Sequence, residues 1–239
     1  MIKLVSYNIR KGKGADGRSA IEMARIGEEL EHLSPTLLLC QEVFHCSRGG
    51  PPQSNGLAEA LGFDHYFGAN KFRAIGDHGN TTLTSMPVTH HENHDISTNP
   101  VERRGALYVR ATLAGLPLHI FNVHLGLDGF QRSTQLKRIG HILDDAVAHH
   151  DPVILAGDFN DWRKQLHAHV HKLDLQSVFT ARGRDMPKTW HARRPVFPLD
   201  RIYVRHLEVV DAGILSGQPW THLSDHLPLW AELRPSSQP

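Results

Sequence analysis

The chain has 239 residues and a net charge of only +1, with 26 Lys and Arg against 25 Asp and Glu. This length suits one large domain or two small ones. The near-neutral charge argues mildly against a dedicated binder of double-stranded DNA, which is often more basic, although a local basic groove could hide in the average. Two cysteines, Cys40 and Cys46, provide neither a disulfide framework nor a zinc motif.

Hydrophobic periodicity predicts alternating strands and helices in the amino-terminal part. In order, we expect a strand over residues 2–9, a basic, glycine-rich surface loop over 10–17, a helix that reaches Ser34-Pro35, a buried strand over 36–43, a loop over 45–55 and a short helix over 57–61. A capping box of Ser19 and Glu22 is expected to start the first helix. Glu42 follows a long apolar run, where a carboxylate is costly to bury unless it is paired or binds a metal.

Strands dominate the rest of the chain. In order, we expect strands over residues 64–68 and 81–85, an edge strand over 88–96, a hairpin of 104–113 and 116–125, a helix over 131–149, a strand over 152–156, a short helix over 161–172, an irregular segment over 180–198, strands over 199–205 and 207–215, a final strand from Ser224 to Leu233 and a frayed tail over 235–239. Many strands and short turns favour packed sheets with outer helices. No linker divides the chain, so we expect one domain over residues 1–239.

Polar residues follow the apolar run over residues 152–156. The run stops at Gly157, and Asp158 and Asn160 come next, two residues apart, so that both side chains can turn into one cleft. A carboxylate suits a hard cation such as Mg²⁺, and a neighbouring amide can hold a phosphoryl oxygen or a water. Alone, this segment is equally typical of a strand end followed by an Asx-type turn.

Further polar clusters border other apolar runs. They are Ser6-Tyr7-Asn8, Cys40-Gln41-Glu42, Asn122-Val123-His124, Leu199-Asp200-Arg201 and Leu223-Ser224-Asp225-His226. In this order, and from Asn8 to His226, they resemble the motifs of the endonuclease/exonuclease/phosphatase superfamily, the DNase-I-like metal-dependent phosphoesterases. The resemblance implies an α/β fold, a four-layer α/β/β/α sandwich of two mixed sheets with a pseudo-twofold plan and a site at one edge of the paired sheets.

The resemblance also implies a cofactor, Mg²⁺ or Mn²⁺. Residues matching Asn8, Glu42 and Asp225 bind or support this cation in the superfamily, and such an oxygen-rich set suits either ion. His226 matches a histidine that pairs with an aspartate, here Asp200, which would orient the ring and stabilise its charge. His226 would then act as a base or as a phosphate-binding cation. The alternatives are an ion pair of Asp200 with Arg201 and a purely structural His226.

The remaining roles concern the phosphate and the attacking water. Asp158 and Asn160 match the pair that contacts both, with Asp158 either the base or a second metal ligand. His124 matches a donor to a phosphoryl oxygen. Arg104 could bind the phosphate through two parallel hydrogen bonds, although a solvent-exposed charge at a sheet edge is the alternative.

These roles together predict a metal-dependent hydrolase of phosphodiesters. The segment Leu199-Asp200-Arg201-Ile202-Tyr203 is closer to the DNase-I, lipid-phosphodiesterase and DNA-end-processing branches than to the apurinic-site nucleases. The blocks Asn8 to Gly12, His78 to Asn80, Asn122 to Leu127 and Gly157 to Trp162 look most like a small bacterial subgroup of the superfamily whose substrate is not settled. Some members of this subgroup are encoded beside cardiolipin synthase, so the resemblance implies a phospholipid-related or small-molecule substrate. The alternatives are a DNA or RNA nuclease and, from another class, a non-catalytic binding module. Because nothing resembles a signal peptide or a membrane span, we also expect a cytoplasmic protein, and a monomer.

Overall fold

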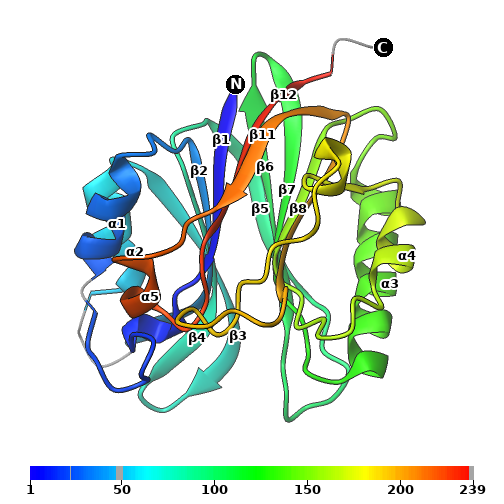
Figure 1. The fold of residues 1–239 in the computed structure, drawn as a ribbon. Coiled ribbons are helices and arrows are strands. Elements are labelled where there is room, and N and C mark those ends of the chain that lie inside the picture. The colour runs from blue at the N-terminus through cyan, green and yellow to red at the C-terminus, as the bar shows by residue number, and fades with distance from the viewer. Residues whose placement is uncertain (22, 47–50, 237–239) are drawn as a thin grey trace.

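Two six-stranded sheets face each other in the computed structural model, which describes residues 1–21, 23–46 and 51–236 (Figure 1). The first sheet contains, in sheet order, β11 (Leu207–Ile214), β12 (Leu229–Pro235), β1 (Ile2–Asn8), β2 (Leu37–Cys46), β4 (Gly76–Thr84) and β3 (Asp64–Arg73). The second contains β5 (Val88–Asp95), β6 (Gly105–Leu113), β7 (Leu116–His124), β8 (Val153–Asp158), β10 (Asp200–Arg205) and β9 (Gln176–Ser177). The third and fourth strands of each sheet run parallel and the other pairs antiparallel, so both sheets are mixed and follow the same plan.

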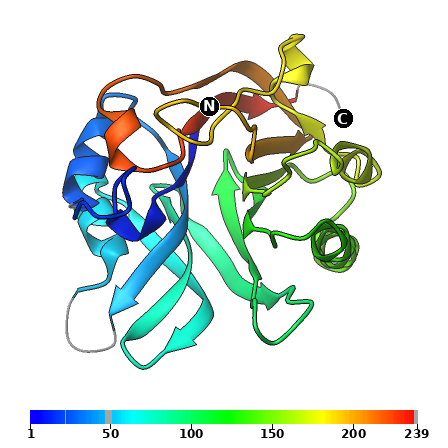
Figure 2. The same ribbon diagram turned by 60° about the horizontal axis from the view of Figure 1, so that its bottom comes forward.

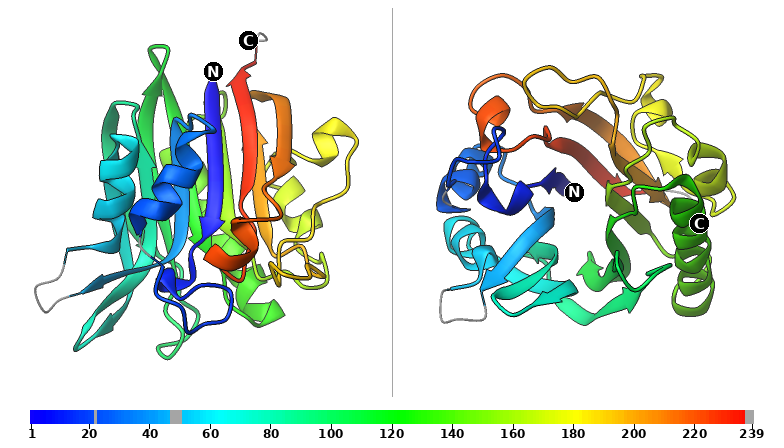
Figure 3. Two further views of the ribbon diagram at one scale, coloured as in Figure 1. Left: turned by 60° about the vertical axis from the view of Figure 1, so that its left-hand side comes forward. Right: turned by 90° about the horizontal axis from the view of Figure 1, so that it is seen from below.

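Helices cover the outer face of each sheet, which completes four layers (Figures 1 and 3). The first sheet carries α1 (Met23–Glu31), α2 (Gln53–Leu61) and α5 (Trp220–Leu223), and the second carries α3 (Gly129–Ala146) and α4 (His167–His171). Short 3-10 helices form at η1 (Arg10–Gly12) and η2 (Thr180–Arg182). The predicted α/β/β/α sandwich is confirmed. None of the helices in the described ranges combines the length and apolar character that crossing a bilayer requires.

The side chains between the sheets change from apolar to polar toward one end. Alternation along a strand sends every second residue to the same face, and Ile2 and Leu4 of β1 pack in the core between the sheets, while Val5 and Tyr7 pack under the helices. The inward series are Ile2, Leu4, Ser6 and Asn8 on β1, Leu118, Ile120, Asn122 and His124 on β7, and Ile154, Ala156 and Asp158 on β8. The polar members meet at one end of the sandwich.

Buried amides join the two sheets at this end. The Nδ2 of Asn122 donates to the carbonyl oxygens of Cys40 and Thr81 at 3.1 and 2.9 Å, and its Oδ1 accepts from Gln41 Nε2 at 2.8 Å. Asn122 and Gln41 are fully buried. These hydrogen bonds therefore fix the distance between the two sheets at their polar end.

Some element boundaries differ from the sequence prediction. β4 begins at Gly76, not at residue 81, because it pairs with the far end of β2, where little apolar surface is buried and no hydrophobic pattern forms. α4 is shorter than predicted, since the Asp161 carboxylate accepts the N–H groups of Gln165 and Leu166 at 3.0 Å and holds the preceding residues in a turn. The final strand begins at Leu229 rather than at Ser224, whose hydroxyl donates to the Asn8 carbonyl instead.

The predicted surface loop over residues 10–17 is in fact packed. Gly12, Gly14 and Ala15 are buried, and Arg10 Nη1 donates to the carbonyls of Gly14 and Ala15. At the other end of the chain, Pro235 still belongs to β12, and the Ser236 N–H donates to the His206 carbonyl. Glu22 of the predicted capping box, residues 47–50 of a predicted loop and residues 237–239 of the predicted tail lie outside the described residues.

Candidate active site

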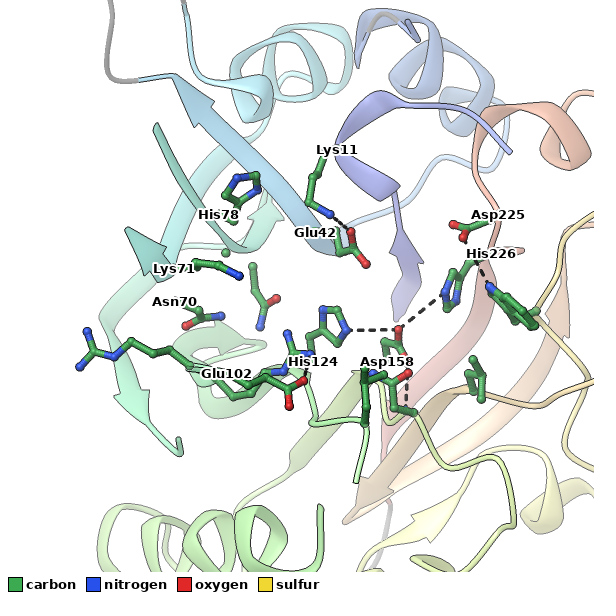
Figure 4. Close-up of a pocket in the computed structure, with 18 of the residues that line it drawn as sticks. Lys11, Glu42, Asn70, Lys71, His78, Glu102, His124, Asp158, Asp225 and His226 are labelled. Atoms are coloured by element: carbon green, nitrogen blue, oxygen red, sulfur yellow. Dashed lines mark hydrogen bonds and ion pairs between the residues drawn. The ribbon is translucent and has the colours of Figure 1, made fainter. Parts of the chain in front are cut away.

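A cavity of about 700 Å³ opens at the polar end of the sandwich. Its walls come from both sheets and from the loops that follow their strands (Figure 4). Seven of the predicted site residues line it: Glu42, Arg104, His124, Asp158, Asn160, Asp225 and His226. The other two predicted residues lie directly behind the cavity wall. Asn8 hydrogen-bonds to Asp158, and Asp200 hydrogen-bonds to His226. The structure thus brings all nine together, from segments spread over most of the chain.

Asp158 lies at the centre of this group. Its Oδ2 accepts from Asn8 Nδ2 at 3.0 Å and lies 3.5 Å from His124 Nε2 and 3.7 Å from His226 Nε2. Burial raises the pKa of Asp158, against the opposing effect of both histidines. Gly157 permits this placement, because a Cβ there would lie 1.9 Å from the Val123 carbonyl oxygen on the neighbouring strand.

His226 is held in its charged form. Its Nδ1 lies 2.8 Å from the Oδ2 of Asp200, and both residues are buried. Burial alone would lower the pKa of His226, but the carboxylates of Asp200 and Asp158 outweigh it and raise the pKa to about 10. Arg201 donates to the backbone carbonyl of Asp200 and not to its carboxylate. The alternative of an Asp200–Arg201 ion pair is therefore not formed.

His124, in contrast, is a neutral ring near pH 7. Burial and the nearby Arg104 guanidinium lower the pKa of His124 to about 4, although Asp158 and Glu42 act in the opposite direction. Asn160 lies beside it with a positive φ of 48°, and its Nδ2 donates to the Leu125 carbonyl at 2.9 Å. The two histidines that flank Asp158 thus carry different charges.

A bulge in β2 turns Glu42 into the cavity. The pairing of β2 with β4 shifts register between Cys40 and Val43, and Glu42 has a φ of 54°. Its carboxylate contacts the Lys11 ammonium and lies 3.4 Å from Asn8 Nδ2. Burial would raise the pKa of Glu42, but His124 and Lys11 lower it to about 2. Glu42 is therefore ionised and already faces a cation.

Asp225 lies across the cavity from Glu42. Its Oδ2 is 3.4 Å from both Arg10 Nε and Trp190 Nε1, and its Oδ1 is 3.5 Å from the Ser224 hydroxyl. These contacts are long, so the carboxylate is only loosely held. Figure 4 shows Lys11 reaching Glu42 on one side of Asp158, and Asp225 with His226 on the other.

Two places could attract a metal ion, the cluster of Asp158, Asp200 and His226 and the carboxylate of Glu42. Asp158, Asp200 and His226 offer ligand atoms within 4.8 Å of one another. However, His226 is protonated and directs its Nδ1 at Asp200, so the ring has no lone pair to give and its charge already balances the carboxylates. Glu42 fits a hard cation better, because an ammonium group already occupies the cation position beside it.

Asn8 supports the two central carboxylates and does not face the cavity with an oxygen. Its Nδ2 points at Glu42 and Asp158, while its Oδ1 accepts the Arg10 N–H at 3.0 Å. Arg104 lines the cavity and pairs with Glu102 at 2.6 Å, with only 18% of its side chain exposed. It is therefore a part-buried, ion-paired group and not a solvated edge charge.

The sequence prediction did not include three residues of the cavity wall, Lys11, Trp162 and Trp190, or Arg10, which contacts Asp225 from behind the wall. Lys11 and Arg10 come from the basic loop that directly follows Asn8, and this proximity was the only signal for them. Trp162 and Trp190 also line the cavity, with ring centres 5.4 Å apart. Both lie in irregular segments without a hydrophobic pattern, although Trp162 comes only two residues after Asn160.

Comparisons with known proteins agree on one family and one fold for this chain. The model of the endonuclease/exonuclease/phosphatase family matches residues 5–226. The uncharacterized protein YbhP of Escherichia coli (strain K12) is 34% identical over 244 residues, which cover 97% of this chain and 95% of YbhP. An endonuclease/exonuclease/phosphatase from Beutenbergia cavernae has a similar structure, with a TM-score of 0.79 and 18% identity over 98% of this chain and 72% of its own. The mannosyl-6-phosphatase Bt3783 of Bacteroides thetaiotaomicron reaches a TM-score of 0.76 with 18% identity over 98% and 100%.

Proposed function

We propose that this chain, which belongs to the endonuclease/exonuclease/phosphatase family, is a divalent-metal-dependent phosphodiesterase that activates water at Asp158. The observation that carries the proposal is the placement of Asp158 between the imidazolium of His226 and the neutral ring of His124, at the wall of one open cavity. A carboxylate whose pKa is raised by burial is a better proton acceptor than one in water.

The roles of these side chains follow from their charges. Asp158 takes a proton from water as the water oxygen bonds to phosphorus and the ester P–O bond breaks. The imidazolium of His226, held by Asp200, stabilises the charge that builds on the phosphoryl oxygens. His124 and Asn160 lie at the same wall and supply neutral polar groups to the phosphate and the water.

A divalent cation, Mg²⁺ or Mn²⁺, would be held by Glu42 and Asp225, with Asn8 in support. Bound there, the cation would offset the negative charge of the phosphate and of the leaving oxygen. The Lys11 ammonium lies against Glu42 and would have to move away for the ion to bind.

The proposal is tested with bis-p-nitrophenyl phosphate, a diester that needs no specific binding site. We expect hydrolysis with Mg²⁺ or Mn²⁺ and none after EDTA. Asp158→Asn and His226→Gln should each lower kcat about 100-fold or more, because each removes a charge used in the transition state. The control Asp174→Asn changes an exposed aspartate with a φ of 56°, which asparagine tolerates, and should leave kcat unchanged. Full activity in either site variant would contradict these roles.

A nuclease is the second candidate, and the tryptophan pair favours it. The rings of Trp162 and Trp190 form an aromatic wall on which a base could stack. Nicking of supercoiled plasmid at a rate well above that on the small diester would select this candidate. A non-catalytic binding module would have no need of the charged pair at Asp158 and His226, and measured metal binding without any hydrolysis would support it.

A further inference from the structure

Exposed hydrophobic side chains gather around the mouth of the active-site cavity. Among the residues that the structure describes, eight large hydrophobic side chains are exposed, and six lie at this end with exposures from 46% to 83%. The six are Phe72, Ile75, Val101, Leu127, Phe130 and Val196. The other two, Met1 and Leu116, lie at the opposite end, where β1 and β7 begin. A distribution this uneven indicates a surface that meets something apolar.

The six side chains come from separate segments at this end of the sandwich. Val196 lies next to the cavity residue Trp190, whose carbonyl accepts its N–H at 2.7 Å. The tip of the β3–β4 hairpin carries Phe72 and Ile75, the β5–β6 loop carries Val101, and the β7–α3 segment carries Leu127 and Phe130. Ile75 and Leu127 line the cavity, and the guanidinium carbon of Arg103 lies 5.9 Å from the centre of the Phe72 ring. Figure 2 brings this end of the molecule forward and shows that the hairpin tip, the β5–β6 loop and the β7–α3 segment all lie there.

The same rim carries positive charge. Lys13 and Lys71 are exposed at the mouth, and neither has an acidic partner within the described part of the chain. Arg103 is also exposed and shares its charge with Asp95 at 3.7 Å. The acidic Glu102 is already paired with Arg104. The exposed acids of the rim are Asp95 and Asp128, so its unpaired positive charge rests on Lys13 and Lys71. Apolar side chains beside such lysines are a combination that binds an anionic membrane surface.

We propose that this rim, made of the six apolar residues with Lys13, Lys71 and Arg103, docks the protein on an anionic lipid bilayer. The cavity then opens toward the phosphate layer of the headgroups, and the apolar side chains enter the boundary with the acyl chains. Nucleic acid fits less well, because phosphate and base contacts use cations and polar groups and leave six exposed apolar side chains without a role. Docking on the bilayer does not depend on catalysis. It has the corollary that the substrate is a lipid phosphodiester, and only this corollary rests on the proposed function.

Docking is tested by sedimentation with vesicles of phosphatidylcholine that contain about 30% phosphatidylglycerol, against vesicles of phosphatidylcholine alone. The triple variant Phe72→Ser, Val101→Ser and Phe130→Ser removes exposed side chains that do not line the cavity. We expect its partition coefficient on anionic vesicles to fall about tenfold or more. The control Leu116→Ser removes an exposed apolar side chain at the far end and should bind as the wild type does. Thermal unfolding should be similar in all three proteins, since every changed side chain is exposed.

Several outcomes overturn the proposal. They are a wild type that does not sediment with anionic vesicles, a triple variant that binds them as the wild type does, and a triple variant that loses binding to double-stranded DNA but not to vesicles. Hydrolysis of bis-p-nitrophenyl phosphate is measured on the same proteins and should be equal in all of them. If hydrolysis is absent while vesicle binding follows the expected pattern, the proposed function fails and the docking surface stands.

Discussion

The two histidines beside Asp158 show how one cavity can hold the same residue type in two charge states. His226 faces Asp200 at 2.8 Å and Asp158 at 3.7 Å, so two carboxylates favour its imidazolium form. His124 is buried near the Arg104 guanidinium, which disfavours a second positive charge. Burial acts on both rings in the same direction, so the difference comes from the charges that each ring faces.

The charge of His226 should depend on Asp200. In Asp200→Asn, loss of the carboxylate lowers the pKa of His226, so the ring loses its proton at a lower pH than in the wild type. We expect kcat to fall about 100-fold at neutral pH, and the alkaline limb of the kcat profile to move to lower pH. The profile is measured with bis-p-nitrophenyl phosphate. An alkaline limb that does not move would mean that His226 does not act as a cation.

The sequence was informative for site residues that border apolar runs and uninformative for those in loops. Asp158, Glu42 and His226 each sit beside a run that must be buried, so their exposure to a common cavity could be expected. Lys11 and Trp190 come from segments whose course is set by contacts with other parts of the chain. The contact between Lys11 and Glu42 has no trace in the residue pattern, because it depends on the bulge in β2.

At the scale of the elements, β2 and β7 set the width of the site. The bulge at Glu42 turns that side chain into the cavity, while Gln41 points between the sheets and reaches Asn122 on β7. Asn122 was part of a polar cluster in the sequence, yet its amide is fully buried and bonded to both sheets. Asn122 lies two residues before His124 on the same face of β7 and is fully buried. It therefore supports the site and does not contact a substrate.

Removing this amide should cost stability. Asn122→Ala removes three hydrogen bonds, two donated to the Cys40 and Thr81 carbonyls and one accepted from the Gln41 amide, so we expect a loss on the order of 3 kcal/mol in the free energy of unfolding. The measurement is urea unfolding followed by circular dichroism. As a control, Asn55→Ala changes an asparagine in α2 without a side-chain hydrogen bond among the described residues and should shift stability by less than about 0.5 kcal/mol. Equal effects of the two variants would exclude a stabilising role for the Asn122 hydrogen bonds.

Most strands could be placed from the sequence because each contributes apolar residues to a core with a period of two. The starts of β4 and β12 could not be placed. β4 extends past the core, where Asp77 and His78 pair with β2 without burying an apolar face. Ser224 to His226 has the polarity of a strand end, but its backbone serves the site, with Ser224 bonded to the Asn8 carbonyl.

For the whole molecule, the half-buried His45 and the buried His119 make stability depend on pH. His45 stacks on Phe67 with ring centres 3.6 Å apart and lies 2.9 Å from the Ser54 hydroxyl. Burial and His65 lower the pKa of His45 to about 4. The pKa of His119, between Tyr108 and Asp151, is also lowered, chiefly by burial. Both rings are therefore neutral in the fold at a pH where an unfolded chain would already protonate them.

We therefore expect the molecule to lose stability as the pH falls from 7 toward 5. Histidines of the unfolded chain take up protons near pH 6.5, whereas His45 stays neutral in the fold until about pH 4, so protonation favours the unfolded state in that window. Urea unfolding at a series of pH values measures the loss. His45→Gln, which keeps a polar side chain, should reduce the loss by on the order of 1 kcal/mol for this half-buried ring. An identical pH dependence in the variant would rule out His45 as a cause.

The pairing of β1 with β12 has a consequence for synthesis on the ribosome. β1 leaves the exit tunnel before the other strands of this fold, yet it lies in the sheet between β2 and β12, with Ile2 opposite Leu233. Until β12 emerges, one edge of β1 has no neighbouring strand. Until the segment with Asp225 and His226 emerges, the cavity beside Asn8 lacks these two residues. A nascent chain without β12 therefore exposes a strand edge that can pair with other chains, and a product that ends before Asp225 would have neither β12 in the first sheet nor Asp225 and His226 at the cavity.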